Sequence, residues 1–129
     1  MHIKHIAIWT HDIEKEKLFY EKYFNAVSNS RYVNDKKGFS SYFLNFDDGC
    51  GLELMHNDSI PENNNDEDEQ YIGIIHFALS VGSKENVDEK TKELAAAGYK
   101  TVSEPRWTGD GYYESCVYDP ENNRIEITI

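Results

Sequence analysis

Cysteine, positive charge and long apolar runs are all scarce in this sequence of 129 residues. Its two cysteines, Cys50 and Cys116, lie late in the two halves of the chain, and without an export signal we expect both thiols to be reduced. No apolar run reaches the roughly 18 residues of a membrane span, and the N-terminus lacks the small-residue cleavage site of a signal peptide. These absences predict a cytoplasmic protein that has no membrane partner.

Positive charge is outnumbered, with 13 Lys and Arg against 24 Asp and Glu and a net charge of −11. Nucleic acids and anionic lipids are bound by neutralising phosphates, so this balance argues against both as partners. Much of the excess lies in ENNNDEDEQ, residues 62–70. Its polar, non-periodic composition favours an exposed linker. The alternative, an acidic cation-binding loop, lacks the glycine-centred spacing of a calcium loop.

An internal repeat organises the rest of the chain. IKHIAIWT, from Ile3 to Thr10, resembles the central stretch YIGIIHFALSV, from Tyr71 to Val81, with an offset of 71 residues from His5 to His76. A helical pattern follows each stretch, and short strands with a glutamate between aliphatic residues, LEL and IEI, close the halves at an offset of 73 residues. The chain is large enough for one domain or two fused small units, whereas about 60 residues alone would be marginal.

Each half is therefore predicted to be a βαβββ unit, which gives an α+β fold with two tandem modules. Module 1 covers about residues 1–58, a linker 59–70 and module 2 residues 71–129 of a single domain. Asp12 and Ser83 are predicted to cap the helices, and Asn25 and Gly98 to end them. The predicted strands are Ile3–Trp9, Ser28–Val33, Phe39–Phe46, Leu52–His56, Ile72–Val81, Tyr99–Ser103, Tyr112–Tyr118 and Arg124–Ile129, with Pro105–Gly111 as a loop.

Strand parity places a histidine and a glutamate of each half on the face away from its helix. Alternation puts Glu53 opposite the leucines of LEL, and Glu126 opposite the isoleucines of IEI. If the two curved sheets face one another around a cleft, His5, Glu53, His76 and Glu126 converge. Such a nitrogen and oxygen set suits one divalent Ni, Zn, Co, Mn or Fe ion. Each residue alone could be an ordinary strand residue, but their shared positions in a repeat favour a metal site.

These residues carry a family resemblance that spans essentially the whole chain. The matching segments are HIAIWTHDIEKEKLFYEKYF, GLELM, IIHFALSV and the closing YDPENNRIEITI, which is the most specific. The chain resembles the vicinal oxygen chelate (VOC) superfamily, the glyoxalase I, bleomycin resistance and dioxygenase group, whose members are built from paired βαβββ units. The resemblance implies metal ligands at His5, Glu53, His76 and Glu126, and a homodimer.

The fourth ligand, Glu53, makes the chain most similar to the glyoxalase I branch. This similarity implies a lactoylglutathione lyase-like activity, in which a proton moves between adjacent carbons of a hemithioacetal or related α-oxo substrate through a metal-bound enediolate. Glu126 is the expected base and Glu53 the second carboxylate, although the sequence does not separate the two roles. A site built within one chain and a site shared across a dimer both stay open.

Substrate-binding candidates are fewer. Only three arginines are present, and Arg31 and Arg124 are candidates to bind an anionic substrate, with a surface position or an ion pair as the alternatives. Trp107 is the third candidate, in an aromatic pocket wall whose members could equally be core residues; the others are Trp9, Tyr42, Tyr112 and Tyr113. His2, His11, His56 and both cysteines are left out of the metal set.

Other members of the superfamily supply the alternative functions. The chain could be a protein that sequesters a drug-like molecule in an aromatic cleft without metal. It could also be a metal-dependent resistance enzyme that opens an epoxide, or an epimerase.

Overall fold

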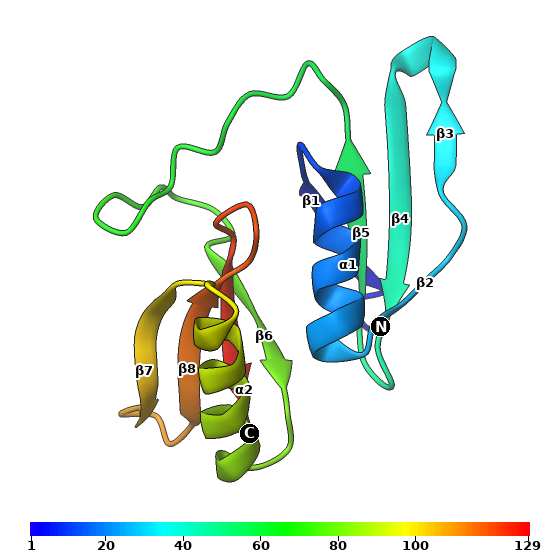
Figure 1. Ribbon diagram of the computed structural model, residues 1–129. Helices are drawn as coiled ribbons and strands as arrows, with labels where there is room; N and C mark the ends of the chain where they lie inside the picture. Colours follow the sequence, from blue (N-terminus) through cyan, green and yellow to red (C-terminus); the bar gives the residue numbers. More distant parts are fainter. The chain divides into compact units, whose positions relative to one another are not determined.

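A computed structural model describes all residues from Met1 to Ile129. The chain divides into two compact units, unit 1 from Met1 to Glu62 and unit 2 from Asn63 to Ile129. Each unit consists of one mixed sheet with one long helix against it (Figure 1). The predicted α+β fold of two βαβββ modules is confirmed, and the boundary falls inside the acidic segment 62–70.

Unit 1 contains a five-stranded sheet, here called sheet 1, in the order β1-β5-β4-β2 with β3 also paired to β4. β1 runs parallel to β5, and all the other pairs are antiparallel. A short 3-10 helix joins β3 to β4. The elements are β1 (His5–Trp9), α1 (Ile13–Phe24), β2 (Val27–Ser28), β3 (Tyr32–Asn34), η1 (Asp35–Lys37), β4 (Phe39–Asn45) and β5 (Gly51–His56).

Unit 2 repeats this topology in a four-stranded sheet, sheet 2, in the order β6-β9-β8-β7. β6 runs parallel to β9, as β1 runs parallel to β5, and the remaining pairs are antiparallel. The elements are β6 (His76–Ser80), α2 (Lys84–Ala96), β7 (Thr101–Trp107), β8 (Tyr113–Tyr118) and β9 (Arg124–Thr128).

Both helices begin and end where their capping residues predict. The Asp12 side chain accepts a hydrogen bond from the backbone N–H of Lys15, and the Ser83 hydroxyl accepts one from Asn86. α1 ends at Asn25, which adopts the left-handed conformation with φ 54°. The chain leaves α2 through Gly98, whose φ of 92° favours glycine.

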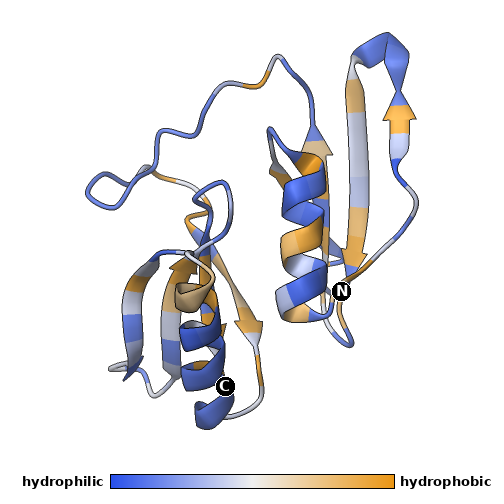
Figure 2. Cartoon of the chain, in the orientation of Figure 1, coloured by the Kyte–Doolittle hydropathy of each residue, from blue (hydrophilic) through white to orange (hydrophobic).

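Each core lies between the helix and the facing side of the sheet. Along α1, apolar residues alternate with polar ones (Figure 2), and Phe19 and Tyr20 are among those buried against sheet 1. Leu54 of β5 and Ile127 of β9 are fully buried at matching positions. The opposite side of each sheet, which carries no helix of its own unit, is called the helix-free face below.

Most strand boundaries differ from the sequence prediction by one or two residues, and three predicted segments differ more. The single strand predicted over Ser28–Val33 is wrong, because β2 and β3 are separate. Ser28 pairs with Leu44 and Tyr32 with Ser41, so one extra residue on this side interrupts the ladder.

In unit 2 the predicted strand Ile72–Val81 is too long, because β6 spans only His76–Ser80 and its ladder partner β9 begins at the residue opposite His76. The predicted loop Pro105–Gly111 is also wrong at its start. β7 continues to Trp107, with register shifts that accommodate the proline.

The acidic segment is exposed but not free of contacts. The Asp66 carboxylate accepts hydrogen bonds from the backbone of Asp68 and Glu69, and these bonds lower the pKa of Asp66. Lys100 forms an ion pair with Glu67. The ion pair therefore connects the segment to the rest of unit 2.

No helix has the length and apolar character needed to cross a membrane. The cytoplasmic location expected from the sequence stays a prediction.

Candidate functional site

The two sheets place their histidine and glutamate in the same register. In sheet 1 Ala7 pairs with Glu53, and in sheet 2 Ala78 pairs with Glu126. The histidine lies two residues before the alanine in both strands, so it projects from the same face as the glutamate. The repeat read from the sequence therefore extends to the pairing of individual residues.

Each histidine meets the glutamate of its own unit. His5 Nε2 lies 3.7 Å from Glu53 Oε2, and His76 Nε2 lies 3.1 Å from Glu126 Oε2. Both imidazoles are about two-fifths exposed, at 41% and 42%, whereas the carboxylates are only 15% and 22% exposed. Neither carboxylate forms an ion pair with lysine or arginine, so both are available to a cation.

The donor set of each pair fits a divalent transition metal. Imidazole nitrogen and carboxylate oxygen are ligands that such ions take together, and the nitrogen and oxygen of each pair already point at one another. Neither unit gathers three or more His, Cys, Asp or Glu side chains around one point. Each pair is thus at most half of a four-ligand set.

The two helix-free faces differ in the row of residues next to the row of Glu53 or Glu126. In sheet 1 the next row of paired residues has one serine and is otherwise apolar or aromatic, and we call it the aromatic row; it contains Trp9, Met55, Ser41 and Tyr32. In sheet 2 the corresponding row is hydrophilic, and we call it the polar row; it contains Ser80, Thr128, Glu114 and Arg106.

Aromatic rings also flank the His5–Glu53 pair. Phe43, the β4 partner of Glu53, packs edge-on against the His5 ring at 5.3 Å between centroids. Phe39 packs edge-on against Trp9 at 6.1 Å and meets Tyr32 at 6.2 Å. These rings form two clusters on the helix-free face, Phe43 with His5 and Phe39 with Trp9 and Tyr32, and together we call them the aromatic surface.

Acidic and basic groups surround the other pair. Burial raises the pKa of Glu114, and the nearby negative charge of Glu126 raises it further, whereas Arg106 opposes the shift. Burial also raises the pKa of Cys116, the β8 partner of Glu126. Cys116 is a free thiol, and the raised pKa keeps it protonated, which argues against a nucleophilic role.

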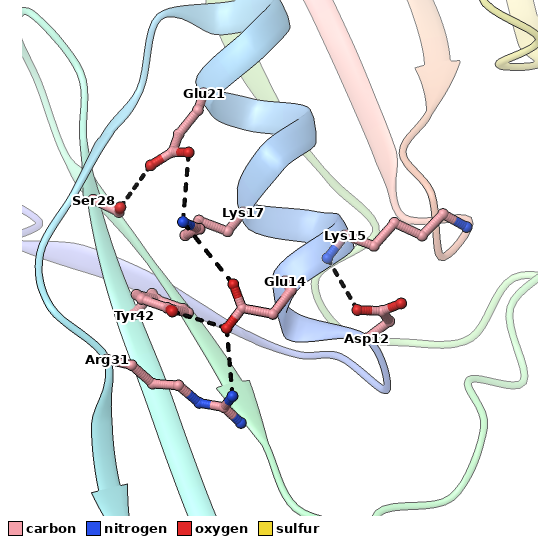
Figure 3. A network of polar contacts seen from close by, with 8 residues as sticks. All are labelled: Asp12, Glu14, Lys15, Lys17, Glu21, Ser28, Arg31 and Tyr42. Atoms are coloured by element: carbon pink, nitrogen blue, oxygen red, sulfur yellow. Dashed lines mark hydrogen bonds and ion pairs between the residues drawn. The ribbon is translucent and has the colours of Figure 1, made fainter.

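Arg31 is not brought to the metal-ligand pair of unit 1. It donates to the Ser40 hydroxyl at 2.9 Å and contacts Glu14 Oε1 at 3.4 Å. Glu14 also accepts from the Tyr42 hydroxyl at 2.8 Å, in a network that joins α1 to the helix-covered face of sheet 1 (Figure 3). His5 and Glu53 project from the opposite face.

Arg124 and Trp107 have different surroundings. Arg124 pairs with His76 in the ladder, and its guanidinium donates to the Asp66 carbonyl oxygen at 2.8 Å. Trp107 pairs with Tyr113 and contacts its ring at 5.3 Å, on the face of sheet 2 that α2 covers. Of the three candidates, only Arg124 lies beside a metal-ligand pair.

The remaining aromatic and histidine candidates divide between the faces. Tyr42 and Tyr113 lie under their helices and Trp9 lies on the helix-free face, while Tyr112 is exposed beside β8. His56 Nδ1 contacts the Thr10 carbonyl oxygen at 2.9 Å.

Arg106 is the functional candidate that the sequence analysis missed. The sequence predicts a loop at Arg106, where strand parity does not apply, whereas β7 puts Arg106 opposite Glu114 on the helix-free face. If the strand is continued through Pro105, strand parity places Arg106 on the same face as Glu114.

A family model matches nearly all of this chain, and a curated relative matches less than half of it. The family described as Glyoxalase/Bleomycin resistance protein/Dioxygenase superfamily matches residues 2–127. The uncharacterized protein YqjT of Bacillus subtilis is 34% identical over 59 residues, which cover 43% of this chain and 46% of YqjT, so the match spans less than half of that relative.

Solved structures share the fold. A glyoxylase/bleomycin resistance protein/dioxygenase domain from Frankia sp. EAN1pec superimposes with a TM-score of 0.83 at 19% identity, over 100% of this chain and 97% of that one. Glyoxalase I from Zea mays gives a TM-score of 0.77 at 18% identity, over 98% of this chain and 44% of the maize chain. With a family match over nearly all of its residues, the chain belongs to the Glyoxalase/Bleomycin resistance protein/Dioxygenase superfamily.

Proposed function

We propose that the chain is a metal-dependent lyase or isomerase of the glyoxalase I type, acting on a hemithioacetal or a related α-oxo substrate. The observation that carries the proposal is one His–Glu pair at the same register position of each repeat. The fold shared with the maize glyoxalase I supports it. A lactoylglutathione lyase-like reaction is the form of this chemistry that the family resemblance favours.

His5, Glu53, His76 and Glu126 are the proposed ligands of one divalent ion, with Ni, Zn, Co, Mn and Fe as the candidates. When bound, such an ion supplies a Lewis acid that polarises two adjacent substrate oxygens and makes a carbon-bound proton easier to remove. The four ligands require one pair from unit 1 and one pair from unit 2.

Glu126 is the proposed base. Its Oε2 lies 3.1 Å from His76 Nε2, so the donor atoms of the two side chains already face one another. Glu53 is more loosely held, at 3.7 Å from His5, and is the proposed group that returns the proton to the neighbouring carbon. Glu126 takes a proton from one carbon and a protonated Glu53 delivers a proton to the next carbon. A proton that passes from Glu126 to Glu53 through solvent restores both carboxyl groups, so the reaction needs no co-reactant.

Calorimetric titration of chelator-stripped protein with Ni²⁺ and Zn²⁺ tests the proposal. We expect about one tightly bound ion per chain, because each ion uses one His–Glu pair from a unit 1 and one from a unit 2. This binding should be lost in His76→Ala. Loss of a histidine outside the proposed set, as in His11→Ala, should leave the titration unchanged. A wild-type protein that binds neither ion would overturn the proposed chemistry.

We further propose a homodimer, which decides where the two pairs come from. If two chains contribute to each site, mixing His5→Ala chains with Glu126→Ala chains restores part of the activity, because one site of the mixed dimer keeps all four ligands. If one chain supplies both pairs, the mixture stays inactive. Sedimentation of the same samples measures the oligomeric state.

A further inference from the structure

The aromatic surface of unit 1 adjoins the proposed metal ligands. Trp9 lies two residues beyond Ala7, the ladder partner of Glu53, which is about 7 Å along the strand. The Phe43 ring touches His5. When the reacting atoms of a substrate lie at Glu53, a single substituent of that substrate is therefore long enough to reach these rings.

The strands of this face supply no cationic partner to an anionic substituent, because none of the five strands of sheet 1 contains a lysine or an arginine. Arg31 lies on the other face, where Glu14 and Ser40 already bind it. A carboxylate placed on the aromatic surface would lose its hydration without gaining a partner.

The repeat shows that these rings are not needed to build such a sheet. At the ladder positions equivalent to Trp9 and Phe43, sheet 2 has Ser80 and Cys116, and it forms the same strand order. Trp9 is 42% and Tyr32 54% exposed, so neither ring is used to fill the core. Exposed rings grouped beside a reactive pair suit binding better than folding.

We propose that Trp9, Tyr32, Phe39 and Phe43 form a subsite for an uncharged aromatic or apolar group of the substrate. Phe39 packs edge-on against Trp9 and at a tilt against Tyr32, and rings held in this way present faces on which a planar group can pack. The preferred substrates are thus aryl or alkyl α-oxo compounds, rather than conjugates whose carboxylates contact unit 1. This inference rests on the proposed function, because it assigns the substrate class of the same site.

Two hydroxamates that differ only in this group provide the test. Benzohydroxamate and acetohydroxamate present the same two adjacent oxygens to a metal but carry a phenyl or a methyl group. In calorimetric titrations of the Zn²⁺-loaded protein, we expect benzohydroxamate to bind at least about tenfold more tightly, because the aromatic surface contacts the phenyl ring.

Three variants locate the effect. Trp9→Ser, which introduces the side chain found at the equivalent position of unit 2, should remove most of the preference and leave acetohydroxamate binding unchanged. Trp9→Phe should keep most of it. Trp107→Ser removes the other tryptophan, on the helix-covered face of sheet 2, and should not alter the ratio.

The possible failures are distinct. Equal binding of the two hydroxamates by wild-type protein, or an unchanged preference in Trp9→Ser, overturns the subsite and leaves the metal chemistry standing. A Trp9→Ser protein that binds both compounds normally but dissociates in sedimentation shows that the surface instead contacts a second copy, which also overturns it. Trp9-dependent binding of benzohydroxamate that is equally tight with and without Zn²⁺ supports the subsite and contradicts the metal site of the proposed function.

Discussion

Unit 1 and unit 2 are alike in their cores and different on their helix-free faces. The buried leucines of β5 and the buried isoleucines of β9 occupy the same ladder positions. One step along the strands, unit 1 has the aromatic row and unit 2 has the polar row at the equivalent positions. The fold thus requires matched apolar residues under the helix, whereas the residues of the helix-free face can vary. We place binding and chemistry on the helix-free face.

The largest expected difference between the two units is in the contributions of their His–Glu pairs to catalysis. Replacing one glutamate at a time measures it. Glu126→Gln should lower kcat about 10²- to 10⁴-fold, because it removes the proposed base while keeping a neutral side chain of the same shape. Glu53→Gln should have a smaller effect on kcat. Steady-state kinetics with an α-oxo substrate, on samples of known metal content, measure both.

A matched control lies on the same face as Glu126. Glu114→Gln removes one negative charge from the polar row and should change kcat far less. Full activity in Glu126→Gln would assign the base elsewhere, and a larger loss in Glu53→Gln would exchange the two roles.

The similarity of the cores can be tested by making the same cavity in each. Leu54→Ala and Ile127→Ala should each lower the free energy of unfolding by about 2–5 kcal/mol, because both side chains are completely buried. Urea denaturation followed by circular dichroism measures the losses. Ile3→Ala, at a position 68% exposed, should change stability by less than about 0.5 kcal/mol.

Unequal losses of stability would show that the two cores are not packed alike. The unit with the smaller loss would be the one whose interior collapses more readily around the cavity. A loss below about 1 kcal/mol at either site would contradict the view that the two cores are packed alike.

Local chemistry and periodicity were sufficient to predict much of the fold. Caps such as Asp12 and Ser83 depend on a side chain and a backbone group three residues away, so the sequence contains the whole interaction. Alternation in LEL and IEI likewise fixed the faces of Glu53 and Glu126, because a strand has a period of two.

The incorrect predictions concern strand ends, because the partner strand determines where a strand begins and ends. Ile72 and Ile74 have a strand-like pattern but are exposed, since β9 offers no residue opposite them. Pro105 was read as a strand end, although β8 continues the ladder past it and thereby places Arg106 on the helix-free face. Which arginine lies near which carboxylate depends on such long-range pairing. The convergence of all four proposed metal ligands stays a prediction.

The smallest expected difference concerns a tyrosine and a carboxylate that join each helix to its sheet. In unit 1 the Tyr42 hydroxyl donates to Glu14, and in unit 2 the Tyr113 hydroxyl donates to Asp88 at 2.7 Å. The hydrogen bond from Tyr113, with a second from Lys84, lowers the pKa of Asp88.

A carboxylate whose pKa is lower in the folded state stabilises the fold above its unfolded pKa of about 3.9 and loses this contribution as the pH falls through the folded value. Tyr113→Phe should therefore raise the pKa of Asp88, whereas Tyr42→Phe should leave it unchanged. Carboxyl titration followed by NMR measures this pKa directly. Because Asp88 lies at the surface, Asp88→Asn should weaken the acid dependence of the thermal midpoint only slightly, and Asp47→Asn controls for the lost charge. An Asp88 pKa that does not respond to Tyr113→Phe would show that Lys84 alone holds it down, and that the two tyrosine links differ in kind as the two helix-free faces do.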